Sequence, residues 1–394
     1  MVKLTVEDLD LGGKRVFVRA DLNVPLAEGR VGDDTRLQAI VPTLQHCLKA
    51  GAAVVLASHL GRPKGKPDPN YSLAPVARRL EEVLGQAVPL ASDCVGEAVE
   101  ARARQLEPGQ ILLLENLRFH PEEEANDAAF AQALARLADC YVNDAFGAAH
   151  RAHASIEAIT RYLSPAAAGL LMQRELEALG RILERPERPL VAILGGAKVS
   201  DKLALVENLL ERVEALVIGG GMAFTFLAAL GHGVGRSLVE PERIELARGV
   251  LVKAGQRGVR VVLPVDMVVA ESPESGEGRV VAVREIPVHL MGLDIGPLTL
   301  ARFGEAVRGA RTVVWNGPMG VFERPPFAAG TLGLARALAA SAAFSVVGGG
   351  DTAAAVHQAG VAEKIGYIST AGGAFLEFLE GRALPGVQAL TDRP

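Results

Sequence analysis

Residues 190–202 read LVAILGGAKVSDK, a continuous apolar run that leads directly into a glycine-rich turn and a segment with two lysines. Such an uninterrupted apolar run is typical of a strand that is buried on both faces of a parallel sheet. Glycines after the strand let the backbone approach a ligand closely, and the N-terminus of a following helix attracts phosphate. The stretch therefore predicts a parallel α/β fold with an anion-binding turn at the end of a strand.

The same pattern recurs along the whole chain. Short runs rich in Val, Ile and Leu predict strands at 15–19, 53–58, 111–115, 140–143, 190–194, 215–218, 260–263, 312–315, 344–347 and 365–368. Intervening segments, such as 73–84 and 128–137, have apolar residues at helical spacing. This alternation of strands and helices predicts a doubly wound α/β architecture.

The chain has 394 residues, more than one hydrophobic core normally serves, so two domains are expected. Residues 168–183 have the pattern of one amphipathic helix, and the stretch ERPERP at 184–189 separates it from a new strand. We place the domain boundary at this helix. Almost every expected strand ends in a polar or glycine-rich turn, and ligands of open parallel sheets bind at the carboxyl ends of strands. The sequence therefore predicts one ligand pocket in each domain.

The composition is that of an ordinary globular protein, with 49% hydrophobic and 22% charged residues. A net charge of -5 with no basic domain argues against a nucleic-acid binder. Cys47, Cys94 and Cys140 are widely spaced and form no CxxC pair, so neither a disulfide framework nor a zinc site is expected. The N-terminus has acidic residues where a signal peptide would be apolar, and no run reaches the length of a membrane span. We expect a cytoplasmic protein.

Three glycine-rich turns in the second half suggest a cradle for nucleotide phosphates. In the first, Lys198 and Lys202 are four residues apart, so both are expected on one face of a helix. Triple glycines at 219–221 and 348–350 each follow a strand. Asp351 comes next, where its carboxylate would hold Mg²⁺ beside phosphates, cap the helix, or do both. The alternative is a set of ordinary turns, since neither a Walker A loop nor a GxGxxG motif of the dinucleotide-binding form is present.

The stretch WNGPMGVFE at 315–323 contains the only tryptophan. Its apolar residues would form a slot for adenine, with Glu323 on the ribose hydroxyls. A buried Trp315 followed by a simple loop explains the same spacing equally well.

Basic and polar residues follow the strands of the first half. They are Arg19, Asp21, Asn23 and Arg36 near the first strand, then SHLGRP at 58–63, NLRF at 116–119 and HRAH at 150–153. Arginines at several strand ends would converge on one anion, which suits a small substrate with phosphate and carboxylate groups. Each arginine alone is better explained as a solvated surface charge. A Ser/His/Asp hydrolase lacks its GxSxG motif, and no HExxH spacing supports His59 as a metal ligand.

Eight motifs in this order resemble the phosphoglycerate kinase family. They are VFVRADLNVPL, SHLGRPKG, LLENLRFHPEE, FGAAHRAHAS, ILGGAKVSDKL, IGGGMAFTFL, WNGPMGVFE and VVGGGDTAAA, which together span nearly the whole chain. The resemblance implies a monomer with two Rossmann-like, doubly wound parallel-sheet domains joined by a helix and hinge. It divides the chain into an N-terminal domain at 1–168, a connecting helix at 169–184, a C-terminal domain at 185–370, and a segment at 371–394 that returns to the N-terminal domain.

The resemblance also implies the ligands of each domain. The N-terminal domain would bind 3-phosphoglycerate through Asp21, Leu22, Asn23, Arg36, His59, Leu60, Gly61, Arg62, Arg118 and Arg151. The C-terminal domain would bind ATP or ADP with Mg²⁺ through Gly196, Ala197, Lys198, Lys202, Gly220, Gly292, Leu293, Asn316, Glu323, Gly349, Gly350, Asp351 and Thr352, with Asp351 as the ligand to the metal. Pattern alone gives no reason to choose Gly292 and Leu293.

The implied activity is reversible phosphoryl transfer between 1,3-bisphosphoglycerate and ADP, in glycolysis or gluconeogenesis. Such transfer depends mainly on positioning and on neutralising charge at the moving group. Closure of the hinge would bring Arg36 from one domain and Lys198, Lys202 and the Gly350 amide from the other onto the phosphoryl group. Two alternatives are a nicotinamide-dependent oxidoreductase and a two-lobed anion-binding protein without turnover. Neither of them predicts paired lysines in one half and several arginines in the other.

Overall fold

The computed structural model describes residues 3–393, and the chain folds into two compact units. One unit contains Met1–Glu177 together with Ala383–Pro394, and the other contains Ala178–Arg382. Helix α6 (Leu170–Leu183) includes the residue at which the chain passes from one unit to the other. Within the described residues, no helix is both long and apolar enough to cross a membrane.

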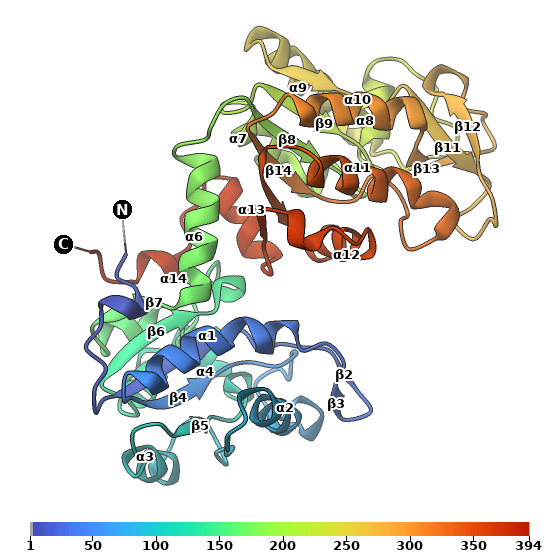
Figure 1. Cartoon of the computed structure of the whole chain (residues 1–394). Coiled ribbons are helices and arrows are strands. Elements are labelled where there is room, and N and C mark those ends of the chain that lie inside the picture. Colours follow the sequence, from blue (N-terminus) through green and yellow to red (C-terminus); the bar gives the residue numbers. More distant parts are fainter. Residues whose placement is uncertain (1–2, 394) are drawn as a thin grey trace. The chain divides into compact units, whose positions relative to one another are not determined.

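The first unit is built on a five-stranded sheet in which all neighbouring strands are parallel, in the order β5-β4-β1-β6-β7. The strands are β1 (Arg15–Ala20), β4 (Ala53–Ala57), β5 (Ile111–Leu113), β6 (Cys140–Asp144) and β7 (Ala166–Ala168), and β2 (Leu26–Ala27) and β3 (Arg30–Val31) form a separate hairpin. Its helices are α1 (Thr35–Lys49), α2 (Ala74–Leu84), α3 (Glu97–Arg104), α4 (Pro121–Glu124), α5 (Ala128–Ala135) and α14 (Pro385–Gln388). Helix α1 lies along the sheet in Figure 1 and packs against β4 and α2.

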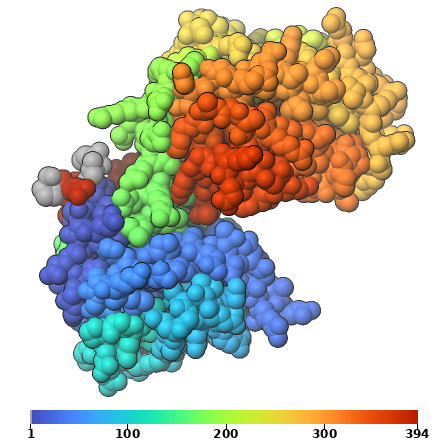
Figure 2. All heavy atoms as spheres, viewed as in Figure 1, coloured from blue at the N-terminus to red at the C-terminus, as the bar shows by residue number. Residues whose placement is uncertain are grey.

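The second unit has a six-stranded parallel sheet in the order β10-β9-β8-β14-β15-β16. The strands are β8 (Leu190–Leu194), β9 (Ala215–Ile218), β10 (Arg260–Val262), β14 (Thr312–Asn316), β15 (Phe344–Gly348) and β16 (Tyr367–Ile368). Its helices are α7 (Leu203–Leu209), α8 (Ala223–Ala229), α9 (Ile244–Gln256), α10 (Pro297–Arg308), α11 (Ala329–Ala339), α12 (Gly350–Gln358) and α13 (Gly373–Leu379). Helices α10, α11 and α12 pack in sequence, and orange and red side chains form much of this unit's visible face (Figure 2).

Each predicted strand has a counterpart in one of the two parallel sheets, and the expected fold class is confirmed. The predictions at 190–194 and 215–218 agree with β8 and β9 at both ends. Strand β7 was not predicted, because Ala168 was assigned to the start of the following helix and the two alanines before it lack the Val, Ile and Leu of the other strands. Tertiary pairing overrides that preference, since Ala166 pairs with Tyr141 of β6 and Ala168 forms a bridge with Thr5.

A second, antiparallel sheet in the same unit was also missed. It has the order β12-β11-β13 and consists of β11 (Asp266–Ala270), β12 (Arg279–Ala282) and β13 (Met291–Ile295). Its strands are short and carry Asp266, Arg279, Gly292 and Asp294, so they lack the continuous apolar run of a doubly buried strand. The omission affects the site, because β11 and β13 supply one wall of the cavity described below.

The C-terminal segment joins the first unit from Ala383 onward. Thr391 takes part in two backbone hydrogen bonds there, donating to Ala166 and accepting from Leu4, both at 2.9 Å. The returning segment was expected to start at 371, but α13 packs on α7 of the second unit, and Asn208 donates to the Leu379 carbonyl at 2.5 Å. The stretch at 371–382 therefore belongs to the second unit.

Candidate active site

A cavity of about 450 Å³ lies in the second unit, at the carboxyl ends of its central strands. Turns that follow β8, β9 and β14 contribute to its wall, together with β11, β13 and the first turn of α12. The residues expected to bind nucleotide that line it are Gly196, Ala197, Gly220, Gly292, Leu293, Glu323 and Asp351. The fold thus brings together residues that are up to 155 positions apart in the sequence, from Gly196 to Asp351.

Glycine is required where two of these turns meet. Gly220 has a φ of +65°, and an added Cβ would lie 2.6 Å from the Gly196 nitrogen. Gly196 itself has a φ of +95°. Any side chain at Gly220 would therefore strain the backbone and push the first two glycine-rich turns apart.

Lys202 is held at the base of these turns with little contact with solvent. Its ammonium donates to the carbonyl oxygens of Gly195 at 2.6 Å and Asn316 at 2.9 Å. Burial lowers the pKa of Lys202 to about 8, while the nearby carboxylates of Asp201 and Asp351 act in the opposite direction. A buried ammonium with carbonyl partners is a fixed positive charge that becomes neutral when the pH rises above this value.

The expectation that Lys198 and Lys202 share one helical face was wrong. Residues 200–202 form a single 3₁₀ turn and α7 begins only at Leu203, so Lys198 precedes the helix and is exposed. The local cause is Glu240, whose carboxylate accepts hydrogen bonds from the amides of Val199 at 2.6 Å and Ser200 at 3.0 Å. A distant carboxylate thus holds the turn, and spacing within residues 190–202 gave no sign of it.

The N-terminus of α12 forms another side of the site. Gly349, with a φ of +94°, precedes the helix, and Gly350 and Asp351 occupy its first turn. Asn316 donates to the Gly348 carbonyl at 2.7 Å, and the Thr352 hydroxyl accepts from the Gly317 amide at 2.7 Å. These bonds tie the end of β14 to the start of the helix. They leave the first amides of α12 free to meet an anion.

The cavity fits a hard divalent cation held through one protein carboxylate. Asp351 is exposed on the cavity wall, beside the free amides of α12. Mg²⁺ commonly binds one or two carboxylates and completes its shell with phosphate oxygens and water. The residues present therefore match a cation that arrives with a nucleotide.

The opposite wall is mostly apolar; the stretch 315–323, expected to form a slot for a base, supplies part of it, and the rest was missed from the sequence. It includes Phe224, Met267, Met291, Met319 and Val321. The slot for a base is thus built from Met and Phe of several elements. Trp315 is instead fully buried in the core, and its indole donates to the Gly317 carbonyl at 2.8 Å. The simpler interpretation of Trp315 was the right one.

One buried carboxyl in this wall has an unusual environment. Asp294 is fully buried and accepts hydrogen bonds from the amides of Gly330 at 2.6 Å and Ile295 at 2.9 Å. Burial raises its pKa to about 7, against the effect of these two bonds. Added Cβ atoms at Gly320 or Gly330 would contact its carboxylate, so the surrounding backbone is packed tightly around it.

In the first unit, the predicted polar residues meet at the carboxyl ends of β1, β4 and β5. The Gly61 amide donates to Asn23 at 2.8 Å, and the Arg118 guanidinium donates to the Gly61 carbonyl at 2.8 Å. Arg36 pairs with Asp21, with Nη1 and Oδ2 2.6 Å apart. Leu22 and Leu60 are anchored in the same turns through their backbone amides, which donate to Ser58 and Asn116.

The low pKa of His59 reflects its burial and the positive charge of this region. Its pKa is well below the usual value because of burial first and then because of Arg19, Arg118, Arg36 and Arg151. The Arg19 guanidinium lies 3.2 Å from Nδ1, and since arginine only donates, Nδ1 accepts and Nε2 carries the proton. Four arginines near one neutral imidazole form the convergent cationic region that the sequence suggested.

Arg62 stands apart from these contacts and is exposed. Arg151 belongs to the region through its charge. Burial first, and Arg151 in addition, lower the pKa of Arg118. Burial and the neighbouring arginines, Arg151 among them, lower the pKa of His153 to about 3. Arg19 was assigned no role of its own from the sequence. Arg19 is buried and donates a hydrogen bond of 2.8 Å to the Ser155 hydroxyl, so it adds positive charge to the region from within the core.

The fold and the two strand-end regions define a two-unit α/β protein in which arginines gather at the strand ends of one unit and glycine-rich turns line a cavity in the other. The family model for phosphoglycerate kinase matches residues 6–382. The phosphoglycerate kinases of Moorella thermoacetica and Pelotomaculum thermopropionicum are 59% and 57% identical to this chain, and each alignment covers 100% of both sequences. The structure of phosphoglycerate kinase from Coxiella burnetii matches with a TM-score of 0.91 at 44% identity, and that from Pyrococcus horikoshii with 0.83 at 35%. Both structural matches cover 98% of each chain.

The chain belongs to the phosphoglycerate kinase family. The resemblance drawn from the eight motifs is therefore confirmed, and the chain is an enzyme of the kinase class. A nicotinamide-dependent oxidoreductase is not favoured.

Proposed function

We propose that this enzyme catalyses reversible phosphoryl transfer between 1,3-bisphosphoglycerate and ADP, giving 3-phosphoglycerate and ATP. The observation that carries the proposal is the cavity of the second unit, where glycine-rich turns, Asp351 and an apolar wall occur together. This combination suits a nucleotide, since the wall fits a base and the free amides of α12 fit phosphates.

The acidic substrate would bind in the first unit. The arginines around His59 supply positive charge, and Asp21 and Asn23 supply acceptors for a hydroxyl group. Arg62, Arg118 and Arg151 would neutralise the stationary phosphate and carboxylate. Arg36 has a different place in the proposal, because its ion pair with Asp21 can be exchanged for one with the transferring phosphoryl group.

Lys202, Lys198 and the first amides of α12 would stabilise the moving phosphoryl group from the nucleotide side. Charge on that group is spread over its oxygens in the transition state, so fixed cations and amides lower the barrier. Mg²⁺, when bound through Asp351 and the nucleotide phosphates, would offset further negative charge. The acceptor carboxylate is already ionised at neutral pH, so the reaction needs no general base.

Because the two substrates are assigned to different units, transfer requires a closed state in which both sites meet. The hinge implied by the family resemblance would allow this closure. Closure would also exclude water and so limit hydrolysis of the acyl phosphate. The enzyme is proposed to act as a monomer in the cytoplasm, with small-molecule substrates and without nucleic-acid or membrane partners.

A steady-state assay with 3-phosphoglycerate and MgATP tests the proposal. ADP should form only when both substrates and Mg²⁺ are present. The same enzyme incubated with NAD⁺ or NADP⁺ should give no reduced nicotinamide. Folded protein that produced no ADP at saturating substrate would refute the assignment.

A further inference from the structure

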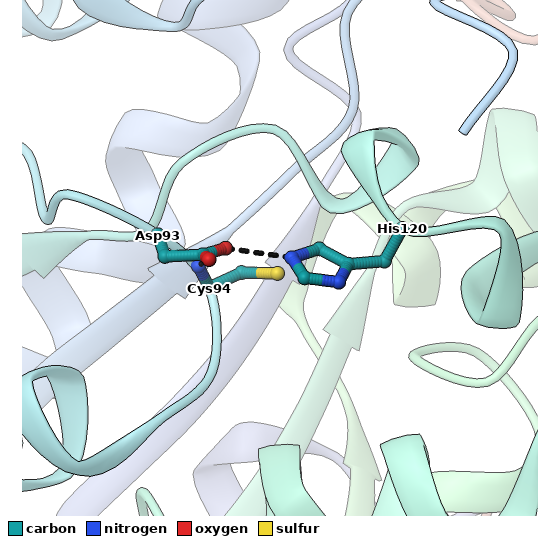
Figure 3. A group of neighbouring side chains, drawn as sticks. All are labelled: Asp93, Cys94 and His120. Atoms are coloured by element: carbon teal, nitrogen blue, oxygen red, sulfur yellow. Dashed lines mark hydrogen bonds and ion pairs between the residues drawn. The ribbon is translucent and has the colours of Figure 1, made fainter. Parts of the chain in front are cut away.

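A cluster of three different metal-binding side chains lies in the first unit, and none of its members is among the residues assigned to substrate. Asp93, Cys94 and His120 each offer one ligand atom, and these atoms all lie within 4.8 Å of one another. In Figure 3 the carboxylate and the sulfur atom both point to the same edge of the imidazole. The His120 Nε2 atom is 2.7 Å from Asp93 Oδ1.

The fold holds the two halves of this cluster together. The segment before Asp93 runs beside β5, with Leu90 and Leu113 forming a parallel bridge. The Glu115 amide also donates to the Asp93 carbonyl at 3.4 Å. His120 follows the 3₁₀ turn Leu117–Phe119 and precedes α4. Both ligand-bearing segments are therefore fixed by backbone contacts.

From this geometry we propose that Asp93, Cys94 and His120 form a binding site for Zn²⁺. Zinc takes cysteine sulfur, histidine nitrogen and carboxylate oxygen in tetrahedral arrangement. Its bonds are about 2.0–2.3 Å long, so two ligands of one tetrahedrally coordinated ion lie about 3.3–3.8 Å apart. Side-chain rotations would bring the three atoms, which all lie within 4.8 Å of one another, to that spacing. Three protein ligands leave the fourth position to water.

The exposure of the three side chains fits a metal better than a catalytic nucleophile. Cys94 is fully buried, so its sulfur is shielded from a substrate in solution. The His120 and Asp93 side chains are 28% and 46% exposed, which gives an ion a path to the sulfur from the outside. On binding, zinc replaces the thiol proton, which passes to solvent, and the contact between His120 and Asp93 gives way to two metal bonds.

The ligand set also separates this site from the magnesium site proposed at Asp351. Mg²⁺ prefers oxygen ligands, whereas sulfur and imidazole nitrogen select zinc. From the wide spacing of the cysteines no zinc site was expected, because that prediction compared only residues that are close in sequence. His120 lies 26 positions after Cys94 and meets it only in the folded chain.

Titration of the whole metal-free protein with Zn²⁺ against a chromophoric chelator, in excess Mg²⁺, tests the proposal. One zinc per chain is expected, and Cys94→Ser and His120→Gln should each weaken binding by at least about 100-fold, the upper end of what loss of a supporting residue costs. Cys47→Ser changes another buried thiol, and His46→Gln another partly buried imidazole of the same unit; both should bind as the wild type does. Asp351→Asn should also leave zinc affinity unchanged.

Cobalt substitution in the wild-type protein gives a readout that needs no variant. Co²⁺ at this site should produce a thiolate-to-metal charge-transfer band and the intense visible bands of a tetrahedral complex. The absence of stoichiometric zinc binding, a cobalt complex without the thiolate band, or unchanged affinity in Cys94→Ser would each overturn the proposal.

Discussion

The ammonium of Lys202 donates a hydrogen bond of 2.9 Å to the carbonyl oxygen of Asn316, the last residue of β14. This contact joins the turn after β8 to the strand whose following loop lines the nucleotide cavity. A buried positive charge is thus fixed to the sheet itself, close to where the phosphates are proposed to bind. Its position makes Lys202 the clearest candidate for stabilising the moving phosphoryl group.

Replacing Lys202 by alanine should lower kcat by roughly 10³–10⁵, the range found for cationic groups at transferring phosphoryls. The KM values should change little, because the charge acts mainly in the transition state. Lys364, an exposed lysine in the same unit, provides the matched control, and Lys364→Ala should keep normal kinetics. If Lys202→Ala raised only the KM for MgATP, the residue would serve binding alone.

The rate should depend on pH through the same side chain. Because burial lowers the pKa of Lys202 to about 8, the charged form disappears as the pH rises through that value, and kcat/KM should fall. The unfolded chain binds more protons than the folded one between this pKa and the ordinary lysine value. This group therefore makes the folded state more stable, not less, as the pH rises there.

Deprotonation of Lys202 does not destabilise the folded state, so unfolding would not explain the fall in rate. Thermal melts along the same pH series check this. Lys202→Arg, whose guanidinium stays charged, should be slower but should lose the decline near pH 8. A wild-type profile that stayed level across this range would show that the Lys202 charge is not needed.

Asp351→Asn tests the proposed magnesium ligand. The amide keeps the shape of the side chain but removes the charge that holds a hard cation. The Mg²⁺ concentration for half-maximal rate should rise, while affinity for 3-phosphoglycerate stays the same. Rates measured over a magnesium titration decide the matter, and an unchanged requirement would leave Asp351 with only a structural role at the start of α12.

Two classes of arginine in the first unit should give different kinetic signatures. Arg36→Ala should reduce kcat with a modest change in KM, since Arg36 is assigned to the transferring group. Arg118→Ala and Arg62→Ala should mainly raise the KM for 3-phosphoglycerate, since both are assigned to stationary anions. Steady-state kinetics after circular dichroism separates the cases. Near-normal kcat with lost substrate affinity in Arg36→Ala would show that this division is wrong.

Much of the fold could be predicted because its central strands are buried on both faces and therefore read as continuous apolar runs. The sheet β12-β11-β13 could not, since its short strands carry charges and glycine and depend on pairing with one another. Strand β7 was hidden for a related reason, because alanine favours a helix until β6 pairs with it.

In the site, too, features with a local sequence pattern could be predicted, whereas features that depend on the folded chain could not. The glycine turns were visible because close backbone approach leaves a mark in the sequence, as at Gly220. Met267 and Phe224 gave no signal, since an apolar residue in a cavity wall looks like one in a core. Glu240, which holds the turn of Lys198, is 42 positions away, and only the folded chain shows the contact.

Transfer of the γ-phosphoryl group of ATP to the carboxylate of 3-phosphoglycerate can be followed with a labelled group. The enzyme at substrate-level concentration would be mixed with MgATP labelled in the γ-phosphate and with 3-phosphoglycerate, and the products separated with and without hydroxylamine. We expect label in an acyl phosphate that hydroxylamine releases, in amounts equal to the ADP formed. Label that appeared only as inorganic phosphate, or that stayed in ATP, would contradict the proposed transfer.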